Sequence, residues 1–372
     1  MKQVLTHLVR ILVAVTFIFS GFVKLVDPLG SAYKFEEYFG ADVLNLEFLI
    51  PFALQFSIVL ILAEILLGVM LLLGYKARLT VWSLFVLSLL FLFLTWYSAY
   101  FNKVTDCGCF GDAVKLSPWE TFYKNVILIA LIVYLLFRIY DIQPFLSELF
   151  ARKLTLLFLV VFIGILFYSL RYLPIIDFRA YAVGKNIPDG MNIPEGAEEP
   201  VYEDTWIYEV NGELQKYSTE DKPWSIEGAK FVDRETRLVQ EGYVPPIHDF
   251  TMEREGEDIT DVLMQKEKLL LVVAYDLNKA DKKGLDKMRR VTIKAMENGY
   301  AAYCFSASTL EDFEALKEKY GWEFDLLFCD ATTLKTIIRS NPGIVTLNKG
   351  TITGKWSWRR AEKIELSILI KI

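Results

Sequence analysis

The chain has 372 residues, of which 53% are hydrophobic and 23% charged, and its formal net charge is −6. The charges are uneven, since residues 1–174 carry 13 Lys and Arg against 11 Asp and Glu, whereas residues 175–372 carry 27 against 35. Four cysteines exclude a disulfide-dense secreted scaffold, and the acidic second half argues against binding nucleic acid, which needs a basic face. We therefore predict a charge-poor membrane part followed by a charged globular part.

Five long apolar runs fill the first half of the chain. Each is near the roughly 20 residues that a helix needs to cross a bilayer. The runs cover residues 5–26, 50–73, 79–100, 119–140 and 154–173. Tyr and Trp stand at several of their ends, as in an interfacial aromatic belt. The pattern predicts five transmembrane helices in contact with membrane lipid.

The distribution of Lys and Arg between the runs indicates the orientation of these helices. The basic residues lie near the N-terminus, at Lys2 and Arg10, in the loop 74–78 and in the segment 138–153. The loop 27–49 is instead acidic. Basic loops favour the cytoplasmic side, so we expect a cytoplasmic N-terminus. An odd number of spans then places everything after the fifth outside, in the periplasm if the membrane is a bacterial inner membrane.

Two local signals refine the membrane part. Ser117-Pro118-Trp119-Glu120 reads as an N-cap, a proline at the first helical position and a glutamate that completes a capping box, so it predicts the start of the fourth span. The five-residue connection 74–78 makes the second and third spans antiparallel neighbours.

The outer loop between the third and fourth spans contains Cys107-Gly108-Cys109. On the oxidising side of the membrane, a disulfide in so small a ring would be strained, labile and oxidising. We therefore favour a redox-active pair. A structural or unreacted pair and a metal site stay open, although the two histidines of the chain, His7 and His248, are both distant in sequence.

Three strings in this half resemble a known family. Phe19–Pro28 at the end of the first span and Glu64, four residues before Gly68, are similar to the DoxX-like family. Cys107-Gly108-Cys109-Phe110-Gly111 resembles its MauE branch. The resemblance covers residues 4–140 and implies a four-helix membrane bundle with redox work at the inner membrane. It implies either disulfide formation in periplasmic partners or oxidation of small sulfur compounds with electrons passed to quinone.

Ionisable residues inside the apolar runs are a second candidate site. Glu64 lies deep in the second run, where a charge is costly unless it is paired or neutral, and Lys24 and Arg10 are the available cations. One hypothesis makes Glu64 and Lys24 a proton relay or a quinone contact. The other makes Glu64 a hydrogen-bonded acid that holds helices in register.

The second half begins with a linker at 184–200, rich in Gly, Pro and acidic residues. A hairpin follows around Asn211-Gly212, joining strands at 205–210 and 213–217, and a further strand is expected at 230–239. After Gly242 strands and helices alternate. We expect strands at 269–274, 300–305 and 324–328, helices at 281–297, 310–320 and 332–339, and a final hairpin of 343–347 and 351–356.

This order of elements is thioredoxin-like. Residues 242–250 resemble the opening strand of peroxiredoxin-like and TlpA-like domains, and Pro342 stands where that family has a cis-proline, so we expect a cis bond there. The Cys-x-x-Cys of the family, expected within 275–282, is absent, so the domain lacks a thiolate nucleophile. Cys304 and Cys329 are expected to be small buried side chains, with a disulfide between them as the alternative.

The predicted architecture is an α-helical membrane bundle, four DoxX-like helices plus a fifth transmembrane helix, followed by a periplasmic α/β thioredoxin-like domain. The expected domains are residues 1–150 for the bundle, 151–175 for the fifth helix, 176–241 for the linker and hairpin, and 242–372 for the degenerate thioredoxin-like domain.

The leading functional hypothesis is an inner-membrane redox protein. Cys107 and Cys109 would be catalytic, Glu64 and Lys24 would relay protons or contact quinone, and Pro342 and Asp276 would bind a periplasmic protein client. No metal and no certain cofactor is expected, quinone being the candidate. The alternatives are a quinone-linked oxidoreductase for small sulfur compounds and a non-enzymatic membrane assembly or binding protein.

Overall fold

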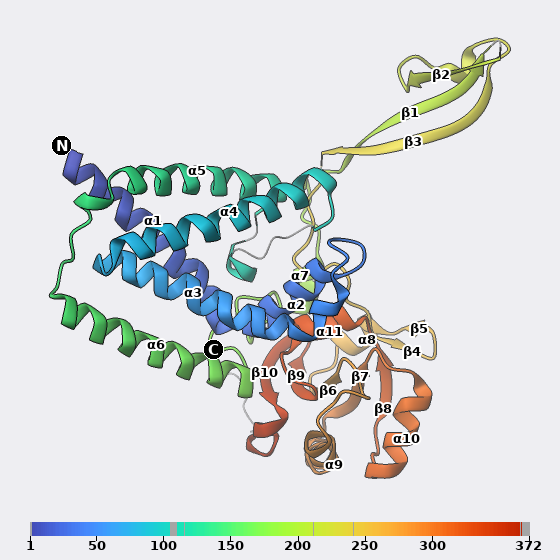
Figure 1. Cartoon of the computed structure of the whole chain (residues 1–372). Helices are drawn as coiled ribbons and strands as arrows, with labels where there is room; N and C mark the ends of the chain where they lie inside the picture. The colour runs from blue at the N-terminus through green and yellow to red at the C-terminus, as the bar shows by residue number, and fades with distance from the viewer. Residues whose placement is uncertain are drawn as a thin grey trace.

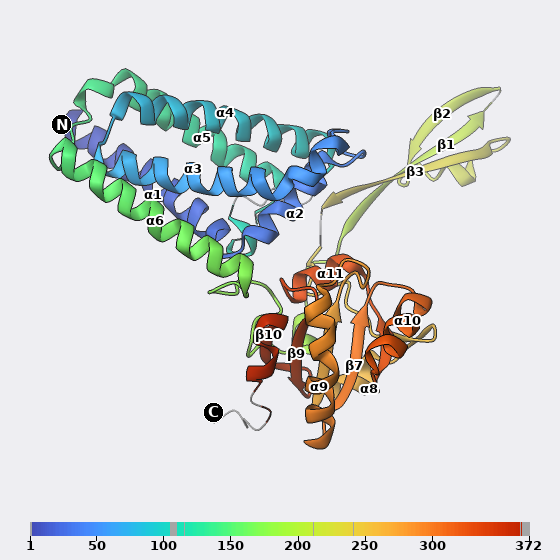
Figure 2. The ribbon, with the colours of Figure 1, turned by 60° about the horizontal axis from the view of Figure 1, so that its bottom comes forward.

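A computed structural model describes residues 2–104, 110–114, 116–210, 212–240, 242–364 and 366. Within this part, five helical segments are long and apolar enough to cross a membrane, as the apolar runs predict. They are α1 (Lys2–Val26), the segment Glu47–Leu73 that joins the 3-10 turn η1 (Glu47–Phe52) to α3 (Ala53–Leu73), α4 (Ala77–Phe101), α5 (Pro118–Phe137) and α6 (Glu148–Arg171). The first four spans form a bundle, and α6 runs beside α3 and α1 (Figures 1 and 2).

The predicted helix signals are confirmed. The Ser117 side chain accepts a hydrogen bond from the Glu120 amide while the Glu120 carboxylate accepts one from the Ser117 amide, which is the capping box at the start of α5. At the other end of the bundle, Gly74 ends α3 in the left-handed conformation that favours glycine, and α4 returns beside α3.

Two glycines bring α1 and α3 into close contact. A Cβ on Gly21 would lie 2.8 Å from the Ile65 side chain, and one on Gly68 would lie 2.8 Å from Ile18. Small residues let transmembrane helices approach closely enough for polar side chains to meet between them.

Arg10 fixes the end of this contact that lies near the loop 74–78 and does not pair with Glu64. Its fully buried guanidinium donates to the carbonyls of Leu71 and Leu72 at 2.7 Å each, and to that of Gln143 at 2.9 Å. A cation here satisfies carbonyls that the end of α3 leaves without partners.

The acidic loop between the first two spans contains a helix that was not predicted. Helix α2 (Pro28–Phe39) starts at Asp27, whose carboxylate accepts a hydrogen bond from the Gly30 amide at 3.1 Å, and proline occupies the first turn. The Asp-Pro pair was the available signal, because Asp is a preferred N-cap and Pro a preferred first residue. The hydroxyl of Ser57 donates to the Pro28 carbonyl and ties α2 to α3.

A three-stranded antiparallel arm follows the membrane part. Strands β1 (Val201–Val210), β2 (Glu213–Ser218) and β3 (Lys230–Gln240) lie in the order β2-β1-β3, and the arm projects away from the bundle (Figure 1). The predicted hairpin of β1 and β2 and the predicted third strand are both present.

The last part of the chain is a seven-stranded mixed sheet in the order β10-β9-β6-β7-β8-β4-β5. Strands β6, β7 and β8 are parallel, whereas β9 and β10 form the predicted terminal hairpin. The strands are β4 (Glu253–Arg254), β5 (Glu257–Asp258), β6 (Leu269–Ala274), β7 (Ala301–Ser306), β8 (Asp325–Phe328), β9 (Gly343–Asn348) and β10 (Thr351–Ser357). The helices are α7 (Ile187–Met191), α8 (Thr260–Met264), α9 (Lys282–Glu297), α10 (Leu310–Tyr320) and α11 (Ala331–Ile337).

Every residue of β6 is buried, because helices cover both faces of the sheet. Leu269, Leu271 and Val273 pack on the side of α7, α8 and α11, and the alternate residues pack on the side of α9. Helix α7 belongs to the first of these layers through Ile187, so part of the predicted linker packs on the domain.

The expected opening strand at 242–250 is wrong, since the described residues of this range form no strand. Pro245 and Pro246 supply no amide N–H for a ladder. The position beside β7 is taken by β8, and the short β4 pairs with β8 instead.

Candidate functional site

The polar pair expected in the membrane is present in the half of the bundle that contains the end of α1. The Lys24 ammonium on the last turn of α1 lies 2.9 Å and 3.1 Å from the two carboxylate oxygens of Glu64 on α3. Lys24 also donates to the Ser20 hydroxyl at 2.7 Å. The side chains of Lys24 and Glu64 are 6% and 1% exposed, so the pair is shielded from water on nearly all sides.

Two cavities meet this pair. A small one of about 20 Å³, with space for about one water molecule, is lined by Glu64, Phe110, Lys124 and Asn125 among others. A large one of about 590 Å³ is lined by Lys24, by α2 and by residues of α11 and of the segment after α6. The large cavity therefore lies between the membrane bundle and the α/β domain.

Cys107 and Cys109 lie outside the described residues, but the chain on either side of them is described. Val104 is fully buried. The Phe110 ring packs 5.4 Å from Phe19 and lies under the Lys124 ammonium at 4.4 Å. Gly111 and Asp112 line the large cavity.

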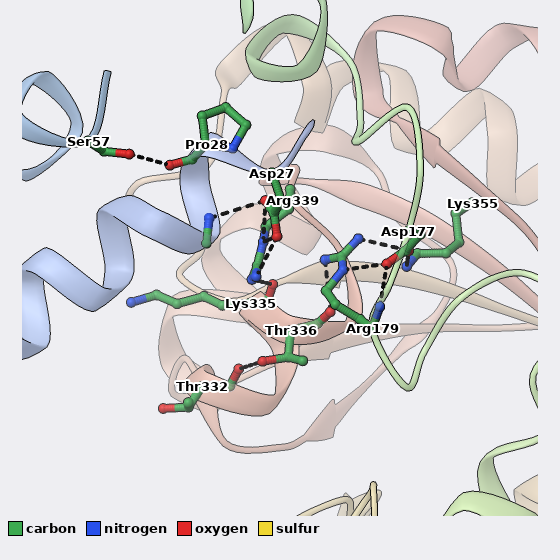
Figure 3. A network of polar contacts seen from close by, with 11 residues as sticks. Asp27, Pro28, Ser57, Asp177, Arg179, Thr332, Lys335, Thr336, Arg339 and Lys355 are labelled. Carbon is green, nitrogen blue, oxygen red and sulfur yellow. Dashed lines mark hydrogen bonds and ion pairs between the residues drawn. The ribbon is translucent and has the colours of Figure 1, made fainter. Parts of the chain in front are cut away.

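An ion pair between Asp27 and Arg339, which are far apart in the sequence, connects the membrane bundle to the α/β domain. Arg339, just after α11, contacts both carboxylate oxygens of Asp27 at 3.0 Å through Nε, and its second terminal nitrogen lies 2.9 Å from Oδ2 (Figure 3). Arg339 also donates to the Lys335 carbonyl. Burial alone would raise the pKa of Asp27, but the Arg339 and Arg179 guanidiniums lower it below its usual value.

A second cluster attaches the segment after α6 to the same face. Asp177 accepts hydrogen bonds from Arg179 at 2.6 Å and 2.8 Å and from Lys355 at 2.7 Å (Figure 3). Arg179 donates onward to the Thr336 carbonyl of α11. Burial opposes ionisation of Asp177, yet the two cations lower its pKa to about 2.

Acidification is therefore expected to weaken this attachment. A carboxylate whose pKa is lower in the folded protein stabilises it above pH 4, and that contribution is lost as the pH falls from about 4 toward 2. The shift at Asp177 corresponds to about 2 kcal/mol. Burial lowers the pKa of Lys355 to about 7, so its titration affects stability only at neutral and alkaline pH. Thermal unfolding of the full chain against pH measures the loss.

The Asp177→Asn variant should be less stable at pH 6 and should lose about 2 kcal/mol of the pH dependence between pH 4 and pH 2, while the part that comes from Asp27 stays. Asp286→Asn, at an exposed position on α9, is the matched control and should retain the whole pH dependence. An unchanged slope in Asp177→Asn would contradict the assignment.

Pro342 and Asp276, the residues predicted to bind a client, lie in the α/β domain close to Arg339. The Asn341–Pro342 bond is cis, as expected, and Pro342 is buried against Gly284 and Trp358. The Asn341 side-chain amide donates to the Asp276 carbonyl at 2.8 Å. The Asp276 side chain is 29% exposed and pairs with Lys279. Among the described residues of the α/β domain, those that line the large cavity come from α11 and Arg339 and do not include Pro342 or Asp276.

Cys304 and Cys329 are free and fully buried. They lie on opposite faces of the sheet, Cys304 with α9 and Cys329 with α11, although β7 and β8 are neighbours. Burial raises the pKa of Cys329 to about 12 and that of Cys304 further, so both are thiols at neutral pH. No group of three or more metal-ligating side chains occurs in the described part of the chain.

Comparison with known proteins gives two matches. Residues 2–138 match the family model of methylamine utilisation protein MauE. A Flavobacterium psychrophilum protein named Protein TlpB is 28% identical over 147 residues, which is 36% of this chain and 36% of that protein. The match thus spans little more than a third of that relative, and no solved structure matches. This chain is therefore a membrane protein whose residues 2–138 are similar to the MauE family and whose later residues form a mixed α/β region.

Proposed function

We propose that this protein is an inner-membrane thiol–disulfide oxidoreductase in which Cys107 and Cys109 cycle between dithiol and disulfide. The observation that carries the proposal is the position of the chain that flanks them. Phe110 lines the small cavity with Glu64, while Gly111 and Asp112 line the large cavity with Lys24. Cys109 directly precedes Phe110 in the sequence, so the described residues next to the cysteine pair line both cavities.

The chemistry needs a substrate that enters the large cavity. Two substrate thiols reduce the Cys107–Cys109 disulfide to a dithiol and become joined by a disulfide themselves, so two electrons and two protons pass to the protein. The reverse reaction reduces a substrate disulfide. The Lys24 ammonium at the cavity wall favours the thiolate, which is the attacking form, and Glu64 behind it is the proposed proton relay.

Quinone, the electron acceptor that the family resemblance implies, does not fit the described cavities. The small cavity of about 20 Å³ is far below the size of an aromatic ring with substituents, and the large one is lined by charged side chains. The proposed exchange therefore runs between substrate and cysteines, and no step is assigned to quinone.

We propose that the α/β region from residue 242 is thioredoxin-like and serves as the non-catalytic wall that holds the client. Support comes from the strand order β10-β9-β6-β7 with β9 antiparallel, from α9 directly after β6, and from the cis bond at Pro342 just before β9. The buried Cys304 and Cys329 have no access to a client. We further propose that this region is periplasmic, as the distribution of Lys and Arg indicates.

Exchange by the purified full-length protein in lipid nanodiscs tests the function. The oxidised protein, mixed with a dithiol peptide, should gain two alkylatable thiols, and mass mapping should locate them at Cys107 and Cys109. The Cys107→Ser and Cys109→Ser variants should lose the exchange. One of them, treated with the disulfide form of the peptide, should accumulate a mixed disulfide, because its remaining thiolate displaces one peptide thiol. Cys304→Ala and Cys329→Ala, as matched controls, should exchange normally.

Full exchange by both serine variants would contradict the proposal and favour the non-enzymatic assembly or binding protein. The observation that favours this second candidate is the projecting arm, where Leu214, Trp224 and Phe231 are all more than half exposed. Large exposed apolar side chains often mark contacts with other proteins.

A further inference from the structure

The large cavity has two walls of opposite chemical character. The membrane domain contributes mainly carboxylates, from Asp27, Glu36, Glu37 and Asp112, although Lys24 and Lys34 lie among them. The α11 wall contributes only cations and hydroxyls, which come from Lys335, Arg339, Thr332 and Thr336. A ligand that spans the cavity therefore meets negative charge on one side and positive charge on the other.

The two ion pairs across the cavity differ in burial and in the distance between their charged atoms. Asp27 and Arg339 are 18% and 6% exposed and share bidentate contacts, so they hold the walls together. Lys335 and Glu36 are 31% and 39% exposed, and their charged atoms are 3.9 Å apart. A long, partly hydrated pair of this kind contributes little to stability, so a ligand can replace it at low cost.

The position of Lys335 is nevertheless fixed. Its ammonium lies 4.7 Å from the ring centre of Tyr33 on α2 and 5.8 Å from that of Tyr275 after β6. Figure 3 shows the side chain extending from α11 toward α2. Cation–π contacts keep an ammonium in place without using up its hydrogen-bond donors on a carboxylate.

We propose that this cavity binds a short zwitterionic peptide thiol, or its disulfide, with the peptide carboxylate at Lys335 and the peptide ammonium at Glu36. The cavity of about 590 Å³ lies in the range of small-molecule sites, and its ten charged lining residues comprise five cations and five carboxylates, which suits a ligand without net charge. The thiol would point toward Gly111 and Asp112, which follow the two cysteines in the sequence. This assignment of the substrate class rests on the proposed thiol–disulfide exchange.

The binding step is testable without any redox reaction. The probe is the dipeptide Cys-Gly with its sulfur methylated, which keeps both terminal charges and cannot exchange. Calorimetric titration of the full-length protein in nanodiscs should give saturable binding. Acetylating the probe's amino group, or converting its carboxylate to an amide, should each weaken binding about tenfold, as loss of one charge-assisted hydrogen bond predicts.

Matched variants assign each charge to its residue. Lys335→Met should lower the affinity for the parent probe about tenfold and leave the affinity for the amide probe unchanged. Glu36→Gln should lower the affinity for the parent probe and leave the affinity for the acetylated probe unchanged. Lys279→Met, which removes an 81% exposed lysine of the same domain, should alter neither.

The possible failures are distinct. Absent binding, or binding that ignores both Lys335→Met and acetylation, overturns the assignment of a zwitterionic peptide, even if Cys107 and Cys109 still exchange with a protein client. Binding with the expected charge pattern but without any exchange leaves the site standing and overturns the proposed oxidoreductase.

Discussion

Replacing Arg339 by methionine is expected to separate the α/β domain from the membrane bundle. The substitution keeps a long side chain but leaves the Asp27 carboxylate buried without its paired cation. Within the described part of the chain, that carboxylate contacts Arg339 and the Gly30 amide. Removing one partner of a buried ion pair costs about 3–5 kcal/mol. Limited proteolysis of the full chain in detergent should then cut the segment after α6 faster, and thermal unfolding should shift to lower temperature.

Arg254→Met is the matched control for this result. Arg254 lies in the same domain and pairs with Asp325, but the two side chains are 45% and 47% exposed. Such a surface pair contributes at most about 1 kcal/mol, so proteolysis should be nearly unchanged. Equal behaviour of Arg339→Met and Arg254→Met would show that the Asp27–Arg339 contact does not hold the domains together.

The second large effect is expected at Lys24. Lys24→Met leaves Glu64, 1% exposed, as an unpaired carboxylate within the bundle, which should lower stability by about 3–5 kcal/mol. The double variant Lys24→Met with Glu64→Leu removes both charges and should recover most of that loss, because an apolar pair needs no partner. Thermal unfolding of the three proteins in the same detergent measures the coupling.

Exchange activity separates a structural pair from a proton relay. If the pair acts in exchange, the double variant should be stable and yet exchange at least about tenfold more slowly than the parent. Lys34→Met, which removes the partly exposed partner of Glu37 on α2, should change stability by less than about 1 kcal/mol. A stable double variant with full activity would assign the pair to helix packing alone.

Much of the fold could be predicted because hydrophobic periodicity is a local property. The five spans follow from runs near 20 residues, and β6 follows from a short apolar run that is buried on both faces. Helix α2 was not predicted because only two of its twelve residues, Tyr38 and Phe39, are large buried aromatic side chains, too few for a periodic apolar pattern. The strand expected at 242–250 from a family resemblance is absent, because its two prolines supply no amide N–H for a ladder.

Part of the candidate site could likewise be predicted from the sequence, and part could not. Lys24 and Glu64 could be predicted as partners because charges inside apolar runs need each other. The cavity walls could not, because Asp27 and Arg339 are 312 positions apart and each is an ordinary charged residue in its own segment. A contact of this range depends on how two domains dock, which no local pattern encodes.

The redox state of Cys107 and Cys109 in intact cells is the most direct test of the proposed function. Cells expressing the Cys304→Ala, Cys329→Ala double variant are treated with a membrane-impermeant reductant, washed, and labelled at intervals with an impermeant maleimide polymer. We expect two labelled thiols directly after reduction and progressive loss of labelling when a membrane-impermeant small disulfide is added after washing, because the pair passes two electrons and two protons to that disulfide on the outer side of the membrane. Thiols that stay labelled after the disulfide is added, or that are reached only after the cells are lysed, would contradict the proposed function.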